Sequence, residues 1–271
     1  MRLFYILALA LAWLTGPPAV ASASVLAVTV GGTKQQFSSA SLLARTDAVK
    51  ITVPHDPSYA RPMQYRAVPL RALLSTGRRD TADTIEVRAT DGFVAQLPRR
   101  LIEGAATPWV AIEDPARPWS RLPQKRVSAG PFYLVWQNPE RSEISPEQWP
   151  YAIASLTTVA SPVQRWPKIA VATSLPAASP LRRGQSLFIA NCLACHRLGG
   201  QGEGTVGPDL LQPMPATAYL TDAGFRALIR NPAAVRSWPE QRMPAFDKAV
   251  ISDSDINAII AYLRALAPRR R

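Results

Sequence analysis

Two closely spaced cysteines followed directly by a histidine constrain this chain more than any other feature. Cys192, Cys195 and His196 form a C-x-x-C-H motif, and these two cysteines are the only ones among the 271 residues. The spacing suits two thioether bonds from the vinyl groups of one porphyrin, with the histidine then held beneath the iron. The motif therefore predicts one covalently attached haem c, with His196 as the proximal ligand.

A second interpretation of the same cysteines is a redox pair. A C-x-x-C sequence also occurs in dithiol and disulfide sites of the thioredoxin type. The histidine directly after Cys195 and the export signal described next both favour the haem.

The N-terminus has the pattern of a secretory signal peptide. The basic start Met1-Arg2 precedes a run of 12 mainly apolar residues, and small residues at 19–23 supply two small-x-small cleavage sites. We expect residues 1–23 to be removed and the protein to be periplasmic. The apolar run is shorter than the roughly 20 residues that span a bilayer, and no later stretch is a candidate, so we expect no membrane span after cleavage. An uncleaved N-terminal anchor is the alternative.

The overall charge is strongly basic, with 31 Lys and Arg against 19 Asp and Glu, a net charge of +12. Such a charge attracts nucleic acids, anionic membranes or acidic proteins. The basic residues are scattered except for Arg269-Arg270-Arg271, and there is no nucleic-acid-binding motif. We therefore expect an acidic redox partner protein and no nucleic acid, with a merely solvated basic surface as the alternative.

Residues 24–165 have the pattern of an α+β domain in which strands predominate. Alternating and β-branched runs predict most of its elements, and Asp91-Gly92 predicts a hairpin turn. We expect strands at 25–30, 49–53, 84–89, 93–95, 109–112, 132–136 and 153–159, and short helices at 38–45 and 69–74.

Three stretches of this domain resemble the sulfite-oxidase-like molybdopterin-binding fold. They are Arg66-Ala67-Val68-Pro69-Leu70 with Leu73-Leu74 after it, Asp91-Gly92-Phe93, and 111–136 with its end Gly130-Pro131-Phe132-Tyr133-Leu134-Val135-Trp136. That family holds molybdenum through a cysteine thiolate, whereas this domain contains no cysteine. The resemblance therefore implies the scaffold of that fold without its molybdenum chemistry.

The second histidine, His55, stands in a predicted loop after a strand. A lone histidine of this kind is most simply a solvated or hydrogen-bonded loop residue. A metal-ligand or second haem-ligand role has no partner histidine to support it. Asp56, Tyr59 and Arg61 nearby suggest a small polar pocket.

The prolines between the two halves predict a linker. Residues 166–180 are rich in Pro, Ala and Ser, which favours a partly extended segment. We place the domain boundary near residue 175 and the second domain at 181–271.

Residues 181 to about 268 resemble a class I cytochrome c domain along its full length, which implies an all-α fold. A helix is expected over 182–191, and a last helix begins after Ser252 or Ser254. In that family a glycine on the first helix lets the last helix cross closely beside aromatic residues. Gly184, Phe188 and Tyr262 match this pattern.

The resemblance also implies two further residues at the haem. In the family a proline carbonyl accepts a hydrogen bond from the proximal histidine, and Pro208 in Gly207-Pro208-Asp209-Leu210 matches that residue. Met243 in Arg242-Met243-Pro244-Ala245-Phe246 matches the sixth iron ligand. Met214 is the rival candidate for that ligand.

These features together predict an exported monohaem electron carrier rather than an enzyme. A haem held by histidine and methionine suits single-electron transfer, because both axial positions are filled. The N-terminal domain would dock or position the haem domain. The alternatives are an enzyme, or the haem subunit of one, that oxidises a small sulfur compound at the N-terminal domain, and a redox or ligand sensor.

Overall fold

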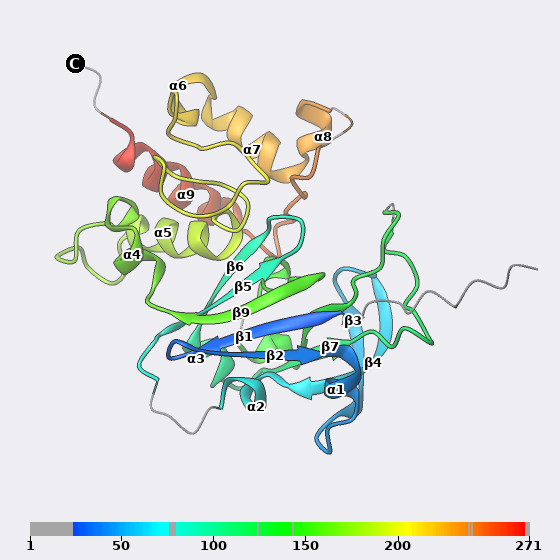
Figure 1. Cartoon of the computed structure of the whole chain (residues 1–271). Coiled ribbons are helices and arrows are strands. Elements are labelled where there is room, and N and C mark those ends of the chain that lie inside the picture. The colour runs from blue at the N-terminus through cyan, green and yellow to red at the C-terminus, as the bar shows by residue number, and fades with distance from the viewer. Residues whose placement is uncertain are drawn as a thin grey trace, which may run out of the picture.

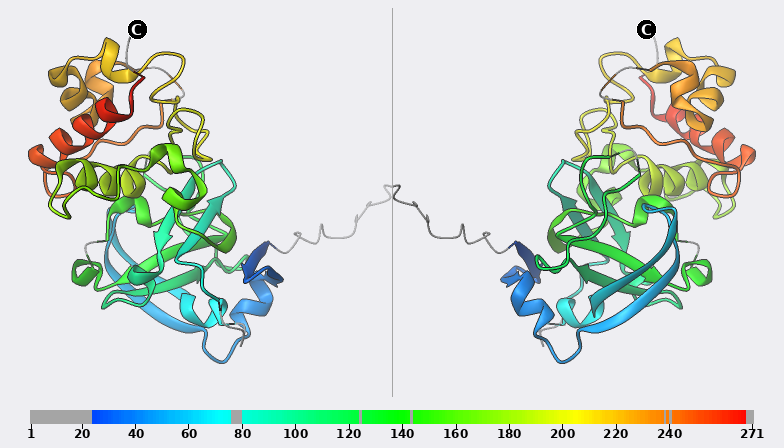
Figure 2. Two further views of the ribbon diagram at one scale, coloured as in Figure 1. Left: turned by 90° about the vertical axis from the view of Figure 1, so that its left-hand side faces the viewer. Right: turned by 90° about the vertical axis from the view of Figure 1, so that its right-hand side faces the viewer.

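A computed structural model describes residues 24–75, 80–123, 125–142, 144–237, 239 and 241–268. The expected signal peptide at 1–23 and the basic run at 269–271 lie outside the described residues. A strand-rich N-terminal part is followed by a helical C-terminal part, and Figures 1 and 2 show the two parts at opposite ends of the molecule. The expected combination of a mostly β domain and an all-α domain is therefore confirmed.

The N-terminal part contains two β-sheets. The order in the first is β2-β1-β9-β5-β6, with β1 and β9 parallel and the other pairs antiparallel, and the order in the second is β3-β4-β7-β8, all antiparallel. The strands are β1 Val25–Val30, β2 Thr33–Ser38, β3 Val49–Asp56, β4 Arg61–Pro69, β5 Thr84–Ala89, β6 Val94–Pro98, β7 Thr107–Ile112, β8 Phe132–Gln137 and β9 Ile153–Val159.

Both sheets contribute to one apolar core. In β1 every second side chain, Leu26, Val28 and Val30, is buried, as the two-residue period of a strand requires. In β8 the five residues from Phe132 to Trp136 are all fully buried. The Trp136 indole nitrogen finds its partner in the Gln148 carbonyl at 2.8 Å, so the buried polar atom is satisfied.

Short helices close the connections between these strands. The Ser38 hydroxyl caps the first of them by accepting a bond from the Ser41 amide at 3.0 Å. The helical segments are α1 Ser39–Leu43, α2 Leu70–Leu74, α3 Arg99–Ile102, η1 Pro139–Ser142, η2 Pro146–Gln148, α4 Pro162–Arg165 and η3 Pro167–Ile169, where η marks a 3-10 helix.

Two strands are additional to the predicted set. Strand β2 is polar and largely exposed, so it lacks the apolar alternation that reveals a strand, and it forms because β1 pairs with it through the turn at Gly31-Gly32. Strand β4 pairs with β3 and β7 in the middle of its sheet.

The C-terminal part is built around a crossing of its first and last long helices. The helices are α5 Pro180–Asn191, α6 Ala216–Tyr219, α7 Asp222–Arg230, α8 Pro232–Val235 and α9 Asp253–Leu266. A Cβ atom on Gly184 would lie 2.1 Å from the Ala258 carbonyl oxygen, so only glycine permits this approach of α5 to α9. Phe188 and Tyr262 pack beside the crossing, with ring centroids 5.7 Å apart.

The segment that joins the two parts is packed against the helices. Ile169 of η3 is fully buried in the helical core, and Val163, Trp166 and Val171 pack against the same core. The Tyr262 hydroxyl of α9 donates a 2.6 Å hydrogen bond to the Ile169 carbonyl. The joining segment thus packs on the helical part, while Arg165 within it is bonded to Glu86 of β5 in the N-terminal part.

Candidate haem site

The C-x-x-C-H motif lies directly at the end of helix α5. Asn191 is the last helical residue and Cys192 caps the helix. The Cys195 and His196 amides both donate to the Cys192 carbonyl, at 3.1 and 2.9 Å, so the chain turns tightly through the motif. Helix α5 therefore fixes where both sulfur atoms and the imidazole are placed.

A carbonyl oxygen orients the His196 ring. Nδ1 of His196 lies 2.7 Å from the Pro208 carbonyl oxygen, the contact that the resemblance implies. A carbonyl can only accept, so Nδ1 must carry the proton, and the lone pair of Nε2 remains free to bind a metal. Burial lowers the pKa of His196, outweighing the opposing effect of the Pro208 carbonyl, and so favours this neutral ring.

The two thiols are poor nucleophiles in this environment. Burial raises the pKa of both Cys192 and Cys195 to about 12, and the charge of Glu147 adds to the effect. Reactive redox cysteines have the opposite property, since a lowered pKa supplies their thiolate. The environment of the motif thus argues against a thioredoxin-like redox pair.

The loop after the motif is held together by the carboxylate of Asp209, a role that has no signal in the sequence. Burial alone would raise the pKa of Asp209, but it is lowered overall because backbone amides donate to the carboxylate. The donors lie 2.6–3.1 Å away and are Gly199, Gly200, Leu211 and Gln212. The loop closes below His196, where a Cβ atom on Gly207 would lie 2.5 Å from Cε1 of the imidazole.

The two candidate methionines are in different environments. Met243 is partly buried and packs against the helical core, as do Cys192 and Leu210. Its neighbour Arg242 lies close enough to Cys195 to act on the pKa of that thiol. Met214 is 47% exposed. The loop of Met243 therefore comes near the motif.

The N-terminal part contacts the motif directly. The Val94 amide of β6 donates a 3.1 Å hydrogen bond to the Ala194 carbonyl, between the two cysteines. The Ser145 hydroxyl, just before η2, donates to the Asn191 side chain. Burial raises the pKa of Glu147 in η2 to about 7, with Lys125 acting in the opposite direction.

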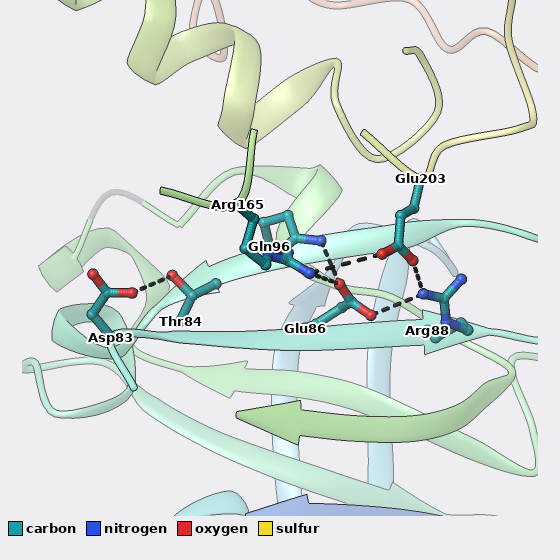
Figure 3. A network of polar contacts seen from close by, with 7 residues as sticks. All are labelled: Asp83, Thr84, Glu86, Arg88, Gln96, Arg165 and Glu203. Carbon is teal, nitrogen blue, oxygen red and sulfur yellow. Dashed lines mark hydrogen bonds and ion pairs between the residues drawn. The ribbon is translucent and has the colours of Figure 1, made fainter. Parts of the chain in front are cut away.

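A polar network extends this contact, and Figure 3 shows its members. Glu86 of β5 is 7% exposed and accepts bonds from Arg165 at 2.6 Å, Arg88 at 2.9 Å and Gln96 at 3.2 Å. Burial opposes its ionisation, but these donors hold the pKa of Glu86 below its usual value. Arg88 and Arg165 also form ion pairs with Glu203 of the loop after the motif.

His55 lies within strand β3 rather than in the predicted loop, and it is exposed. Its neighbour Asp56 is only 1% exposed and accepts hydrogen bonds from the Tyr65 and Tyr133 hydroxyls at 2.7 and 3.1 Å. Asp56 thus serves the core of the N-terminal part. A depression of about 480 Å³ is lined by His55 together with Arg61 and neighbouring prolines.

The residues around the motif fit a haem. Two thiols and an imidazole with a free Nε2 are the donor set that covalent attachment and iron ligation need. Partly buried apolar side chains, among them Leu210 and Met243, pack against the same helical core as Cys192. Cys192 and Cys195 would bond to the porphyrin and His196 would bind the iron, which supplies a one-electron change between Fe(III) and Fe(II). Fold and site therefore define a haem-binding, electron-transfer class of domain.

Comparison with known proteins agrees with this class. Residues 181–267 match the family model of cytochrome c, so the C-terminal part of the chain is a cytochrome c domain. No curated protein matches the chain. Among the described residues, none of the helices combines the length and the apolar character that crossing a bilayer would require.

Proposed function

We propose that this protein is an exported monohaem c-type cytochrome that passes single electrons to or from an acidic redox partner in the periplasm. The observation that carries the proposal is the arrangement of Cys192, Cys195 and His196, with the imidazole oriented by Pro208 at 2.7 Å. The signal-peptide pattern at 1–23 supports export, and the net charge of +12 supports an acidic partner.

Met243 is the proposed sixth ligand of the iron. Its partial burial against the helical core, and the position of the adjacent Arg242 near Cys195, support this role. The exposure of Met214 counts against this residue as the sixth ligand. Pro244 restricts the backbone of Met243 to extended conformations, so the ligand loop is stiff. A thioether opposite an imidazole favours Fe(II) and raises the reduction potential.

The residues of this chain contribute by holding one geometry in both oxidation states. His196 keeps its Nδ1 proton on the Pro208 carbonyl, so its ring does not rotate. Asp209 fixes the loop that carries Pro208. A site that changes little on electron transfer needs little reorganisation, which suits a carrier.

The N-terminal domain, residues 24–165, is proposed to have the sulfite-oxidase-like scaffold and to position the haem domain. Its three resembling stretches lie at the start of α2, at the β5–β6 turn and in strands β7 and β8. Because both cysteines of the chain are in the C-terminal part, the molybdenum-binding residue of that family is missing. Its contacts at the haem motif support a positioning role.

Acid–acetone extraction and metal analysis of the protein purified from a periplasmic fraction test this proposal. We expect the haem to stay with the chain, one iron per chain, and no stoichiometric molybdenum. Haem that is extracted free of the protein would contradict covalent attachment. Stoichiometric molybdenum would instead support an enzyme.

A further inference from the structure

We propose that the N-terminal domain positions the proximal histidine, and that Glu203 is the residue through which it does so. Glu203 lies in the loop between the C-x-x-C-H motif and Pro208, and it is bound by arginines from the other domain. This inference rests on the proposed function, because it assumes that His196 binds the haem iron.

Ion pairs attach Glu203 to the N-terminal domain. One oxygen of its carboxylate accepts from Arg88 of β5, and the other lies 3.8 Å from Nη1 of Arg165. Both arginines are themselves fixed by the buried Glu86, and the Arg165 guanidinium stacks 4.2 Å from the Trp166 ring centroid. Glu86 therefore helps to hold both cations in place for Glu203, and Figure 3 shows the contacts of the two arginines with Glu86 and Glu203.

The adjacent residue packs tightly on the motif. A Cβ atom on Gly204 would lie 2.6 Å from the Cys195 carbonyl carbon and 2.8 Å from the His196 amide nitrogen. Backbone therefore lies on backbone at this point. A displacement of Glu203 would be transmitted to Gly204 and hence to the motif.

The same loop also contacts the His196 imidazole. The Gly207 amide donates a 2.8 Å hydrogen bond to the Cys195 carbonyl, and Gly207 lies against the face of the His196 ring. The next residue, Pro208, provides the carbonyl that accepts from Nδ1 of His196. Only the short segment 204–207 separates Glu203 from that acceptor, so the anchored carboxylate determines where the acceptor lies.

The β5–β6 hairpin holds the same loop at a second point. Gly92, at the hairpin turn, lies so close to Thr205 that a Cβ atom there would be 2.9 Å from its hydroxyl oxygen. The Val94 amide bonds the Ala194 carbonyl inside the motif. An exposed ion pair alone contributes little, so the effect depends on this combination of ion pairs and close backbone contacts.

The consequence for the iron concerns electron donation by the imidazole. A hydrogen bond from Nδ1–H to a carbonyl makes the ring a stronger donor, which stabilises Fe(III) and lowers the reduction potential. A loop that moves away weakens that bond and raises the potential. The positioning role therefore predicts a potential that depends on contacts in another domain.

The test is the midpoint potential of the full-length holoprotein with Arg88→Gln. Removing a nearby positive charge, taken alone, favours Fe(III) and lowers the potential. Loss of the positioning of His196 would instead raise the potential. We expect the midpoint potential to rise in Arg88→Gln and in Glu203→Gln. In the double variant the shift should be no larger than the larger of the two single-variant shifts. Hydrogen exchange at Nδ1 of His196, followed by NMR, should be faster in each variant.

A charge exchange and a matched control complete the test. Arg88→Glu combined with Glu203→Arg should restore the potential and the exchange rate. Asp222→Asn, which breaks an ion pair of similar exposure with Arg264 elsewhere on the same domain, should leave both near the original values. A lowered potential in Arg88→Gln, or no rescue by the charge exchange, would overturn the positioning role while leaving the carrier intact. Absence of covalent haem would overturn both proposals.

Discussion

The two domains obtain their order in different ways. The N-terminal domain encloses a large continuous core between two hydrogen-bonded sheets, whereas the cytochrome c domain has a smaller core and long irregular loops. The cytochrome c domain depends on a few specific contacts: those of Asp209 and Glu203 in its loops, the helix crossing at Gly184, and the residues proposed to bind haem. One domain is held by its own strands, while the other relies on a few specific residues, and this difference can be tested directly.

Loss of haem attachment is expected to have the largest effect. Replacing Cys192 and Cys195 by alanine removes the covalent bonds, and the haem contributes folding free energy only while it is bound. Hydrogen exchange read by mass spectrometry should show lost protection over 181–267 and retained protection over 24–160. Equal loss of protection in both regions would contradict the difference between the domains.

Adding a single methyl group at the helix crossing should have the second largest effect on stability. Gly184→Ala places a Cβ atom 2.1 Å from the Ala258 carbonyl oxygen, and overpacking of this kind costs about 1–3 kcal/mol or more. The matched control is Gly224→Ala in α7, where the nearest atom to the added Cβ would be at an ordinary 3.4 Å. Because alanine favours helices, the control should stabilise slightly. Similar urea midpoints for the two variants would refute the close crossing.

The interface between the domains should give a smaller, pH-dependent effect. Burial raises the pKa of Glu147 from 4.5 to about 7, so between these values the folded protein binds more protons than the unfolded chain. Stability should therefore fall as the pH rises from about 4.5 to 7, by at most about 3 kcal/mol, and stay level above that.

Glu147→Gln should abolish this slope in denaturant titrations, because the amide does not ionise. Glu140→Gln in the neighbouring η1 segment serves as the control and should keep the slope. A slope that persists without Glu147 would mean that another group at the interface titrates. Lys125 is one such group, because its charge acts on Glu147.

Much of this organisation could be predicted from the sequence, because the informative residues act locally. The hairpin at Asp91-Gly92 and the caps at Ser38 and Ser252 depend on residues within a few positions of one another. Strand β2 could not be predicted, since its polar sequence becomes a strand only through pairing with β1.

The residues of the site likewise divide into those that have a local signal in the sequence and those that do not. The motif and Pro208 follow from residue types and spacing, together with the family resemblance. Glu203, Asp209 and Glu147 carry no local signal of their roles, because each acts through partners brought close by folding. A pair such as Arg88 and Glu203, 115 positions apart, becomes visible only in three dimensions.

If His196 and Met243 hold one haem iron for electron transfer, Met243→Ala and Met214→Ala should behave differently. Met243→Ala should abolish the near-infrared methionine-to-iron band of the oxidised protein, lower the reduction potential and open the iron to carbon monoxide. Met214→Ala should leave all three nearly unchanged, in keeping with its 47% exposure. The reverse outcome would make Met214 the ligand, and no effect from either variant would contradict methionine ligation altogether.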